Sequence, residues 1–170
     1  MAKIIFITGG QRSGKSRKAK ELAMALSQQP IYLATARVWD DDFKNRIERH
    51  KADRGPMWRT IEEPVNIASH EFKHDDVVVM DCITLWLTNI FHDNDYDTDK
   101  AFTTSIKLWD DFVSRDFTLI AVSNELGMSL HSENEAGRKF TDLQGWMNQH
   151  IAGMASEAWL MVAGLGVRLK

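Results

Sequence analysis

Four residues near the start of the sequence have the spacing of a phosphate-binding loop. Gly9, Gly14, Lys15 and Ser16 fit the pattern G-x-x-x-x-G-K-[ST], with an apolar run before it and a helix-forming run after it. Backbone N–H groups in such a loop, and at the N-terminus of the following helix, bind anions. Lys15 could reach the β- and γ-phosphates of a nucleotide, and the Ser16 hydroxyl could hold Mg²⁺. A glycine-rich turn before an ordinary helix is the alternative, but the strand and helix patterns on either side favour a P-loop.

Asp81 is a second candidate for this chemistry. Four apolar residues, 77–80, precede it, and a carboxylate at the end of a buried strand can hold Mg²⁺ opposite a P-loop serine. In open α/β sheets the carboxyl ends of the strands meet at the edge where ligands bind. An acid that only solubilises the strand end is the alternative, and the P-loop favours the functional interpretation.

The segment 40–53 has the pattern of a helix that carries a potentially reactive histidine. Asp42, Arg46 and His50 recur every four residues and would share one helix face. Neutral imidazole is a nucleophile near neutral pH, and the basic side chains of 46–54 could bind phosphates. The pattern also fits a packed structural histidine on a solvated, charged helix. Both interpretations stay open on the residues alone.

Asn124 and Glu125 follow another predicted core strand, 119–123. They would lie at its carboxyl end and could face a substrate; a turn with a helix cap is the alternative. The single cysteine, Cys82, is interpreted as a small buried residue, because nothing in the sequence suggests an activated thiol.

Short apolar runs alternate with helical patterns along the chain, which is typical of a parallel α/β fold. We predict one P-loop NTPase-type domain over residues 1–170, with a mostly parallel central sheet flanked by helices and a C-terminal hairpin. The expected strands are 3–8, 31–35, 58–62, 76–81 and 117–123, and the hairpin joins 158–163 to 167–169. The expected helices are 14–27, 40–53, 64–73, 83–91, 100–114 and 133–153.

Composition narrows the range of functions. The 170 residues are 44% hydrophobic and 26% charged, which suits one globular domain with a continuous core. A formal charge of −3 argues against a broad basic surface that would bind nucleic acid. One cysteine cannot form an internal disulfide, and no apolar run is long enough for a membrane span or a signal peptide. We therefore expect a soluble, cytoplasmic protein that neither binds nucleic acid nor inserts into a membrane.

Several further motifs occur in a specific order along the sequence. They are TGGQRSGKS (8–16), YLATA (32–36), RIERH (46–50), WRTIEEP (58–64), DCITLW (81–86) with Asn89, SNELG (123–127) and GLGV (164–167). Together they resemble the bifunctional adenosylcobinamide kinase / adenosylcobinamide-phosphate guanylyltransferase family of cobalamin biosynthesis (the CobU/CobP family). The resemblance covers nearly the whole chain, and the ordered set is far more specific than the P-loop alone.

The resemblance implies an enzyme with two activities. It would use ATP or GTP to phosphorylate the aminopropanol hydroxyl of adenosylcobinamide, with Mg²⁺ as cofactor. It would then transfer GMP from GTP to that phosphate through a guanylylated histidine, which gives adenosylcobinamide-GDP and pyrophosphate. A member of the family forms a trimer, so we expect a homo-oligomer.

The resemblance also implies the site residues. The family histidine falls on His50, which with Lys15 makes the catalytic pair, and Ser16 and Asp81 would hold the metal. Arg49 stands where some members have a second histidine, so His50 is the only acceptor in this motif. The implied nucleotide contacts are Gly9, Gly10, Gln11, Arg12, Ser13, Gly14, Lys15, Ser16, Thr35, Ala36, Arg37, Lys51, Ala52, Asp53, Arg54, Glu62 and Asp81.

Two other functions fit a P-loop considered by itself. A GTP-binding regulatory switch protein would require a partner protein and would carry no covalent nucleotide on a histidine. A small-molecule kinase with another acceptor would transfer phosphate but not GMP.

Overall fold

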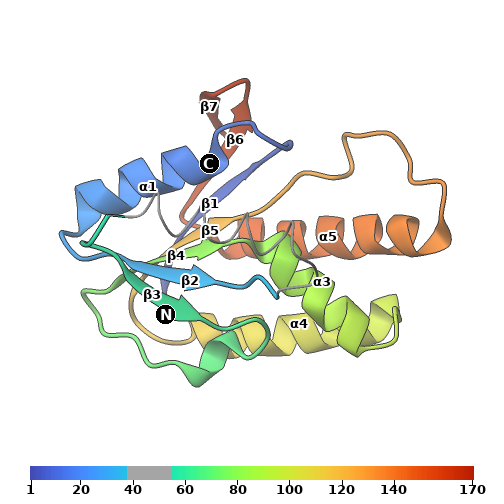
Figure 1. Cartoon of the computed structure of the whole chain (residues 1–170), viewed down its shortest axis with the longest axis horizontal. Coiled ribbons are helices and arrows are strands. Elements are labelled where there is room, and N and C mark those ends of the chain that lie inside the picture. Colours follow the sequence, from blue (N-terminus) through green and yellow to red (C-terminus); the bar gives the residue numbers. More distant parts are fainter. Residues whose placement is uncertain (38–54) are drawn as a thin grey trace.

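In the computed structural model, a seven-stranded sheet with the order β3-β2-β4-β5-β1-β6-β7 forms the centre of the molecule (Figure 1). The structure describes residues 1–37 and 55–170. The strands are β1 (Lys3–Gly9), β2 (Ile31–Ala34), β3 (Arg59–Glu62), β4 (Val77–Asp81), β5 (Thr118–Val122), β6 (Glu157–Val162) and β7 (Leu165–Arg168). All neighbouring strands pair in parallel except β6 and β7, which form an antiparallel hairpin. The predicted fold class and the C-terminal hairpin are therefore confirmed.

Helices cover both faces of the sheet. The described helices are α1 (Lys15–Leu26), the 3₁₀ turn η1 (Ile67–Ser69), α3 (Ile83–Asp93), α4 (Thr98–Val113) and α5 (Glu135–Met154). Figure 1 shows α1 on one side of the sheet and α4 and α5 on the other. Within the described ranges, no helix has both the length and the apolar character needed to cross a bilayer.

Strand side chains alternate between two hydrophobic cores, as the pleat requires. In β5, Ile120 and Val122 pack with α1, whereas Leu119 and Ala121 pack in the larger core that α3, α4 and α5 cover. All four are buried. A strand that is buried on both faces reads as a continuous apolar run, which is why these segments could be identified in the sequence.

Side-chain caps set the true starts of two helices. The Asp97 carboxylate accepts from the backbone N–H of Lys100 (3.0 Å), so α4 begins at Thr98 rather than at residue 100. Asn134 accepts from the N–H of Gly137 (2.7 Å), so α5 begins at Glu135 rather than at residue 133.

The predicted helix 64–73 is wrong, because only the short turn η1 forms there. The Glu63 carboxylate accepts from the N–H groups of Val65 (3.0 Å) and Asn66 (2.8 Å), as a cap at a helix start does, but only the short turn η1 follows. The Val65 carbonyl, which a helix would use internally, instead accepts from the indole N–H of Trp86 (2.8 Å). The predicted helix 40–53 lies outside the described residues.

Two buried tryptophans offer a matched test of this interpretation. Trp86 and Trp109 are both fully buried, and their rings lie 6.3 Å apart. The Trp86 N–H has a partner in Val65, but the Trp109 N–H has none among the described residues. Trp86→Phe should lower the free energy of unfolding by about 1 kcal/mol more than Trp109→Phe, because only Trp86→Phe removes an existing buried hydrogen bond, the one to the Val65 carbonyl. Urea unfolding of the two variants measures the difference, and equal losses would contradict an anchoring role for the bond to Val65.

Candidate active site

Those predicted site residues that the structure describes lie at the carboxyl edge of the sheet. Gly9 ends β1 and Asp81 ends β4, with β5 between these two strands. Asp81 is level with Val122 of β5 and with Ala34 of β2 in the parallel register. Ligands of open α/β sheets bind outside this edge, so the arrangement fits a ligand site shared by several strands.

The shape of the P-loop depends on glycine at two positions. Gly9 has φ +150°, and a Cβ there would collide with the Met161 carbonyl oxygen and lie 2.9 Å from Ser13 Oγ. Gly14 has φ +98°, and its Cβ would lie 3.3 Å from the Cα of Gly164. Side-chain-bearing residues rarely adopt such angles, so both motif glycines are explained by backbone geometry and close packing.

The turn of the C-terminal hairpin supports the P-loop from one side. The Gly164 N–H donates to the Ser13 carbonyl (3.0 Å), and the Arg17 guanidinium donates to the Gly164 carbonyl (3.1 Å). No local sequence pattern indicates this contact, because about 150 positions separate the two segments. The positive φ of Gly164 (+83°) is the local feature that lets the turn lie so close to the loop.

Lys15 and Asp81 form the charged centre of this edge. Lys15 is buried, and its ammonium donates to the Gly10 carbonyl (2.6 Å). Burial lowers the pKa of Lys15, while the negative charge of Asp81 acts in the opposite direction. The Ser13 hydroxyl is buried in the loop without a partner among the described residues. A buried cation and an unpaired buried hydroxyl in one glycine loop suit an anionic ligand.

Thr35 holds the backbone that follows Asp81. Its side chain is fully buried, its hydroxyl donates to the Cys82 carbonyl (2.8 Å), and the hydroxyl oxygen accepts from the Cys82 N–H (3.1 Å). Burial raises the pKa of the Cys82 thiol to about 12, so the thiol stays protonated and is a poor nucleophile. The structure therefore uses the Thr35 side chain to join the ends of β2 and β4.

Two residues of α3 also hold the end of β2, and the sequence pattern did not single them out for this role. The Asn89 amide donates to the carbonyls of Thr35 and Pro64, both at 2.8 Å. Asp93 forms a bidentate ion pair with Arg37 at 2.7 and 2.6 Å. This pairing raises the pKa of the Arg37 guanidinium and lowers the pKa of Asp93. The nucleotide role of Arg37 stays a prediction, because the guanidinium already has a carboxylate partner.

The sequence-predicted residues thus fall into two groups. The loop 9–16, residues 35–37, Glu62 and Asp81 lie at or next to the carboxyl ends of β1, β2, β3 and β4. Within the loop, Gln11, Arg12 and Ser16 are exposed. The predicted residues His50, Lys51, Ala52, Asp53 and Arg54 lie outside the described part of the chain, so their roles stay predictions.

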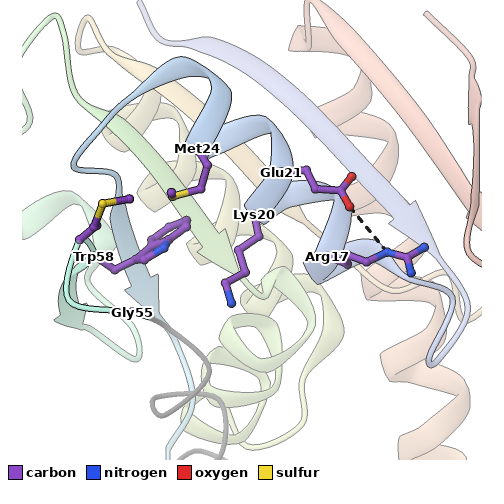
Figure 2. Close-up of a pocket in the computed structure, with 7 residues that line it drawn as sticks. Arg17, Lys20, Glu21, Met24, Gly55 and Trp58 are labelled. Carbon is purple, nitrogen blue, oxygen red and sulfur yellow. Dashed lines mark ion pairs between the residues drawn. The ribbon is translucent and has the colours of Figure 1, made fainter.

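A pocket of about 400 Å³ adjoins α1. Its lining residues are Arg17, Lys20, Glu21, Met24, Gly55, Met57 and Trp58. Figure 2 shows Met24 and Trp58 facing each other at one end, while the ion pair of Arg17 and Glu21 (3.8 Å) lies at the other. Neither Lys15 nor Asp81 lines this pocket, so it is separate from the charged centre.

Comparisons with known proteins match this chain to one family over nearly its whole length. The model of a family described as cobinamide kinase / cobinamide phosphate guanyltransferase matches residues 5–169. The "Bifunctional adenosylcobalamin biosynthesis protein CobU" of Escherichia coli (strain K12) is 35% identical over 181 residues, covering 98% of this chain and 99% of that protein. The "Bifunctional adenosylcobalamin biosynthesis protein CobP" of Pseudomonas aeruginosa is 36% identical over 168 residues, covering 96% of this chain and 95% of that protein.

A likeness to one solved structure concerns the fold alone. That structure is a prototypical ATPase from the type III secretion system of pathogenic bacteria, with a TM-score of 0.51 and 12% sequence identity. The match covers 98% of this chain and 56% of the ATPase.

Lys15→Ala tests whether the loop binds phosphate. The variant should fold normally and lose nucleotide-dependent turnover by about 10²-fold or more, the scale for removing one preorganised charge. Fluorescence titration with a labelled GTP analogue and a turnover assay measure the effect. Lys107→Ala, an exposed change on α4, is the matched control. Near-normal GTP turnover by folded Lys15→Ala would exclude a role for this loop.

Proposed function

The chain belongs to the cobinamide kinase / cobinamide phosphate guanyltransferase family, and we propose that the carboxyl edge of its sheet is where both reactions take place. The protein is a bifunctional enzyme of adenosylcobalamin biosynthesis. The observation that carries the proposal is the position of Lys15 and Asp81 at one edge, beside a loop with an unpaired buried hydroxyl. The family match does not support the alternatives of a regulatory switch or a kinase for an unrelated acceptor.

In the first step, the aminopropanol hydroxyl of adenosylcobinamide attacks the γ-phosphate of ATP or GTP. The backbone N–H groups of the P-loop bind the phosphate oxygens, and Lys15 stabilises the charge that develops on the transferred group. The lowered pKa of Lys15 reflects its burial, and a buried cation interacts more strongly with phosphate than an exposed one. Lys15 is therefore the main electrostatic contribution of the described residues.

The donor set at this edge fits Mg²⁺. The Ser16 hydroxyl at the start of α1 and the Asp81 carboxylate at the end of β4 are oxygen ligands, which Mg²⁺ prefers. No group of three or more His, Cys, Asp or Glu side chains in the described ranges could hold a metal by itself. This agrees with an ion held by one or two protein oxygens together with substrate phosphates. When bound, Mg²⁺ would neutralise phosphate charge.

The second step transfers GMP through His50. The imidazole attacks the α-phosphorus of GTP, pyrophosphate leaves, and the phosphoramidate then passes GMP to adenosylcobinamide phosphate. An imidazole with a reference pKa of about 6.5 is largely unprotonated at neutral pH. Lys51 and Arg54, next to His50 in the sequence, would bind the triphosphate. This part of the proposal rests on the sequence and on family membership.

Both activities would belong to one domain of a homo-oligomer. All described strands join a single sheet, which supports one domain over 1–170. The hairpin exposes three apolar side chains, Val162, Leu165 and Val167, each more than half accessible. Apolar groups gathered on an edge hairpin suit contact with another copy of the chain, and a trimer is the arrangement that the family suggests.

Asp81→Asn tests the metal role. Replacing the carboxylate by an amide removes a negative ligand and keeps the size of the side chain. The variant should require more Mg²⁺ and transfer phosphate more slowly, with an unchanged circular dichroism spectrum. A Mg²⁺ titration of cobinamide phosphorylation measures this, and Asp111→Asn, an exposed change on α4, is the control. An Mg²⁺ titration identical to that of the wild type would contradict the metal role and favour the alternative that Asp81 only solubilises the strand end.

His50→Asn tests the covalent step. The change keeps a polar side chain and removes the nucleophile, so α-labelled GTP should no longer give an acid-labile, base-stable adduct. Formation of adenosylcobinamide-GDP should stop, while phosphorylation of adenosylcobinamide persists. His74→Asn, which removes an exposed histidine at the far edge of the sheet, should keep both activities.

The outcomes for His50→Asn separate three explanations. Retained GMP labelling would place the nucleophile elsewhere. Loss of both activities with an intact fold would mean that His50 serves nucleotide binding in general.

A further inference from the structure

The backbone at Asn124 continues the sheet beyond the end of β5. The Ser123 N–H donates to the Ile7 carbonyl (2.9 Å), and the Glu125 N–H donates to the Gly9 carbonyl (3.0 Å). These two bonds repeat the parallel ladder between β5 and β1. Asn124 therefore lies in extended backbone directly beside the first glycine of the P-loop.

The pleat places Asn124 on the same face of the sheet as Asp81. Ile120 and Val122 of β5 belong to the core under α1, and Asn124 is the next residue in that alternation. Ser123 points to the opposite face, because its hydroxyl donates to Asn148 of α5 (2.6 Å). Since β5 separates β1 from β4, Asn124 lies between the P-loop and Asp81, on the side that α1 covers.

Two elements fix the backbone of Asn124. Its N–H donates to the Thr84 hydroxyl (3.1 Å) in the first turn of α3, and its carbonyl accepts from the Asn148 amide (3.1 Å) of α5. Asn148 also accepts from the Gln144 amide (3.0 Å) inside a buried polar cluster. Such bonds restrict the position and direction of the peptide.

Among the described residues, no partner fixes the side chain of Asn124 in this way. It is partly exposed, and no hydrogen bond to its amide is found in the described part of the chain. It does not cap α5, because Asn134 performs that role. Asparagine is unfavourable in a strand. A fixed backbone with a side-chain amide that has no partner in residues 1–37 and 55–170 therefore indicates a ligand contact rather than a structural turn.

We infer that Asn124 is a further catalytic residue of the kinase step, and this inference rests on the proposed function of the carboxyl edge. Its amide donates to a non-bridging oxygen of the transferred γ-phosphoryl group, between Lys15 and Asp81. In this step a bond forms between the acceptor hydroxyl oxygen and the γ-phosphorus. The bond from that phosphorus to the β–γ bridging oxygen breaks, and the hydroxyl proton passes to water. A neutral donor aimed at the moving group stabilises the transition state more than the ground state.

The test compares Asn124→Ala and Asn124→Asp with the wild type in two separate assays. The first measures steady-state phosphorylation of adenosylcobinamide, and the second measures the GMP adduct formed from α-labelled GTP. Asn124→Ala should lower kcat for phosphorylation by about 10²-fold, with KM for the nucleotide changed by less than about threefold. Asn124→Asp should be slower still, because a carboxylate repels the phosphoryl oxygens. Adduct formation, at the α-phosphate, should fall much less.

Controls separate chemistry from folding and charge. Gln149→Glu adds the same charge at an exposed position of α5 and should leave both assays unchanged. Thr84→Val removes the acceptor for the Asn124 N–H and should lower kcat in the same direction by a smaller factor.

Three results would overturn the inference. They are a kcat within twofold of wild type in folded Asn124→Ala, an effect confined to KM, and equal losses in both assays accompanied by a lower Tm. Failure of the proposed function would look different, because the wild-type protein itself would then not phosphorylate adenosylcobinamide.

Discussion

Parallel pairing of β1, β5 and β4 is the constraint on which the rest of the structure depends. Because these strands run in one direction, the P-loop and Asp81 must lie at the same edge. β5 holds them two strand spacings apart, roughly 10 Å at about 4.8 Å per spacing. That separation suits a phosphate chain with one end at the glycine loop and the other near the carboxylate. The strand in between supplies its own polar residue, Asn124, to the gap.

Buried polar side chains make this edge rigid. An unpaired polar group inside a protein costs free energy, whereas a paired one fixes the direction of its partners. Thr35 joins β2 to the residue after Asp81, and Asn89 joins the ends of β2 and β3 to α3. Asn148 does the same for β5 and α5. The apolar cores hold the layers together, and these bonds set where each loop leaves the sheet.

The sequence predicted well what depends on neighbouring residues. The glycine spacing, the run before Asp81 and the final hairpin are local patterns, and the structure has each of them in its expected place. The prediction of a helix at 64–73 was wrong. The indole N–H of Trp86, 21 positions from Val65, donates to the Val65 carbonyl, which a helix would use internally.

The ion pair of Arg37 and Asp93 could not be predicted from the sequence either, because 56 positions separate the two residues. Such contacts join segments that only the complete fold brings together, and no periodic pattern in the sequence indicates them. The role that we propose for His50 rests on family resemblance, because the sequence pattern around it fits a structural histidine equally well.

The support of the P-loop by the hairpin turn has a consequence for how the protein is made. The loop is synthesised about 150 residues before Met161 and Gly164, which pack against its glycines. During translation the growing chain folds from its N-terminus, so α1 and β1 leave the ribosome long before this wall of the loop exists. A nucleotide therefore cannot stabilise the early nascent chain through the completed loop. The completed loop forms only when β6 and the hairpin turn have joined the sheet. Nucleotide binding at this loop therefore stabilises the fully folded protein and does not stabilise partly folded intermediates.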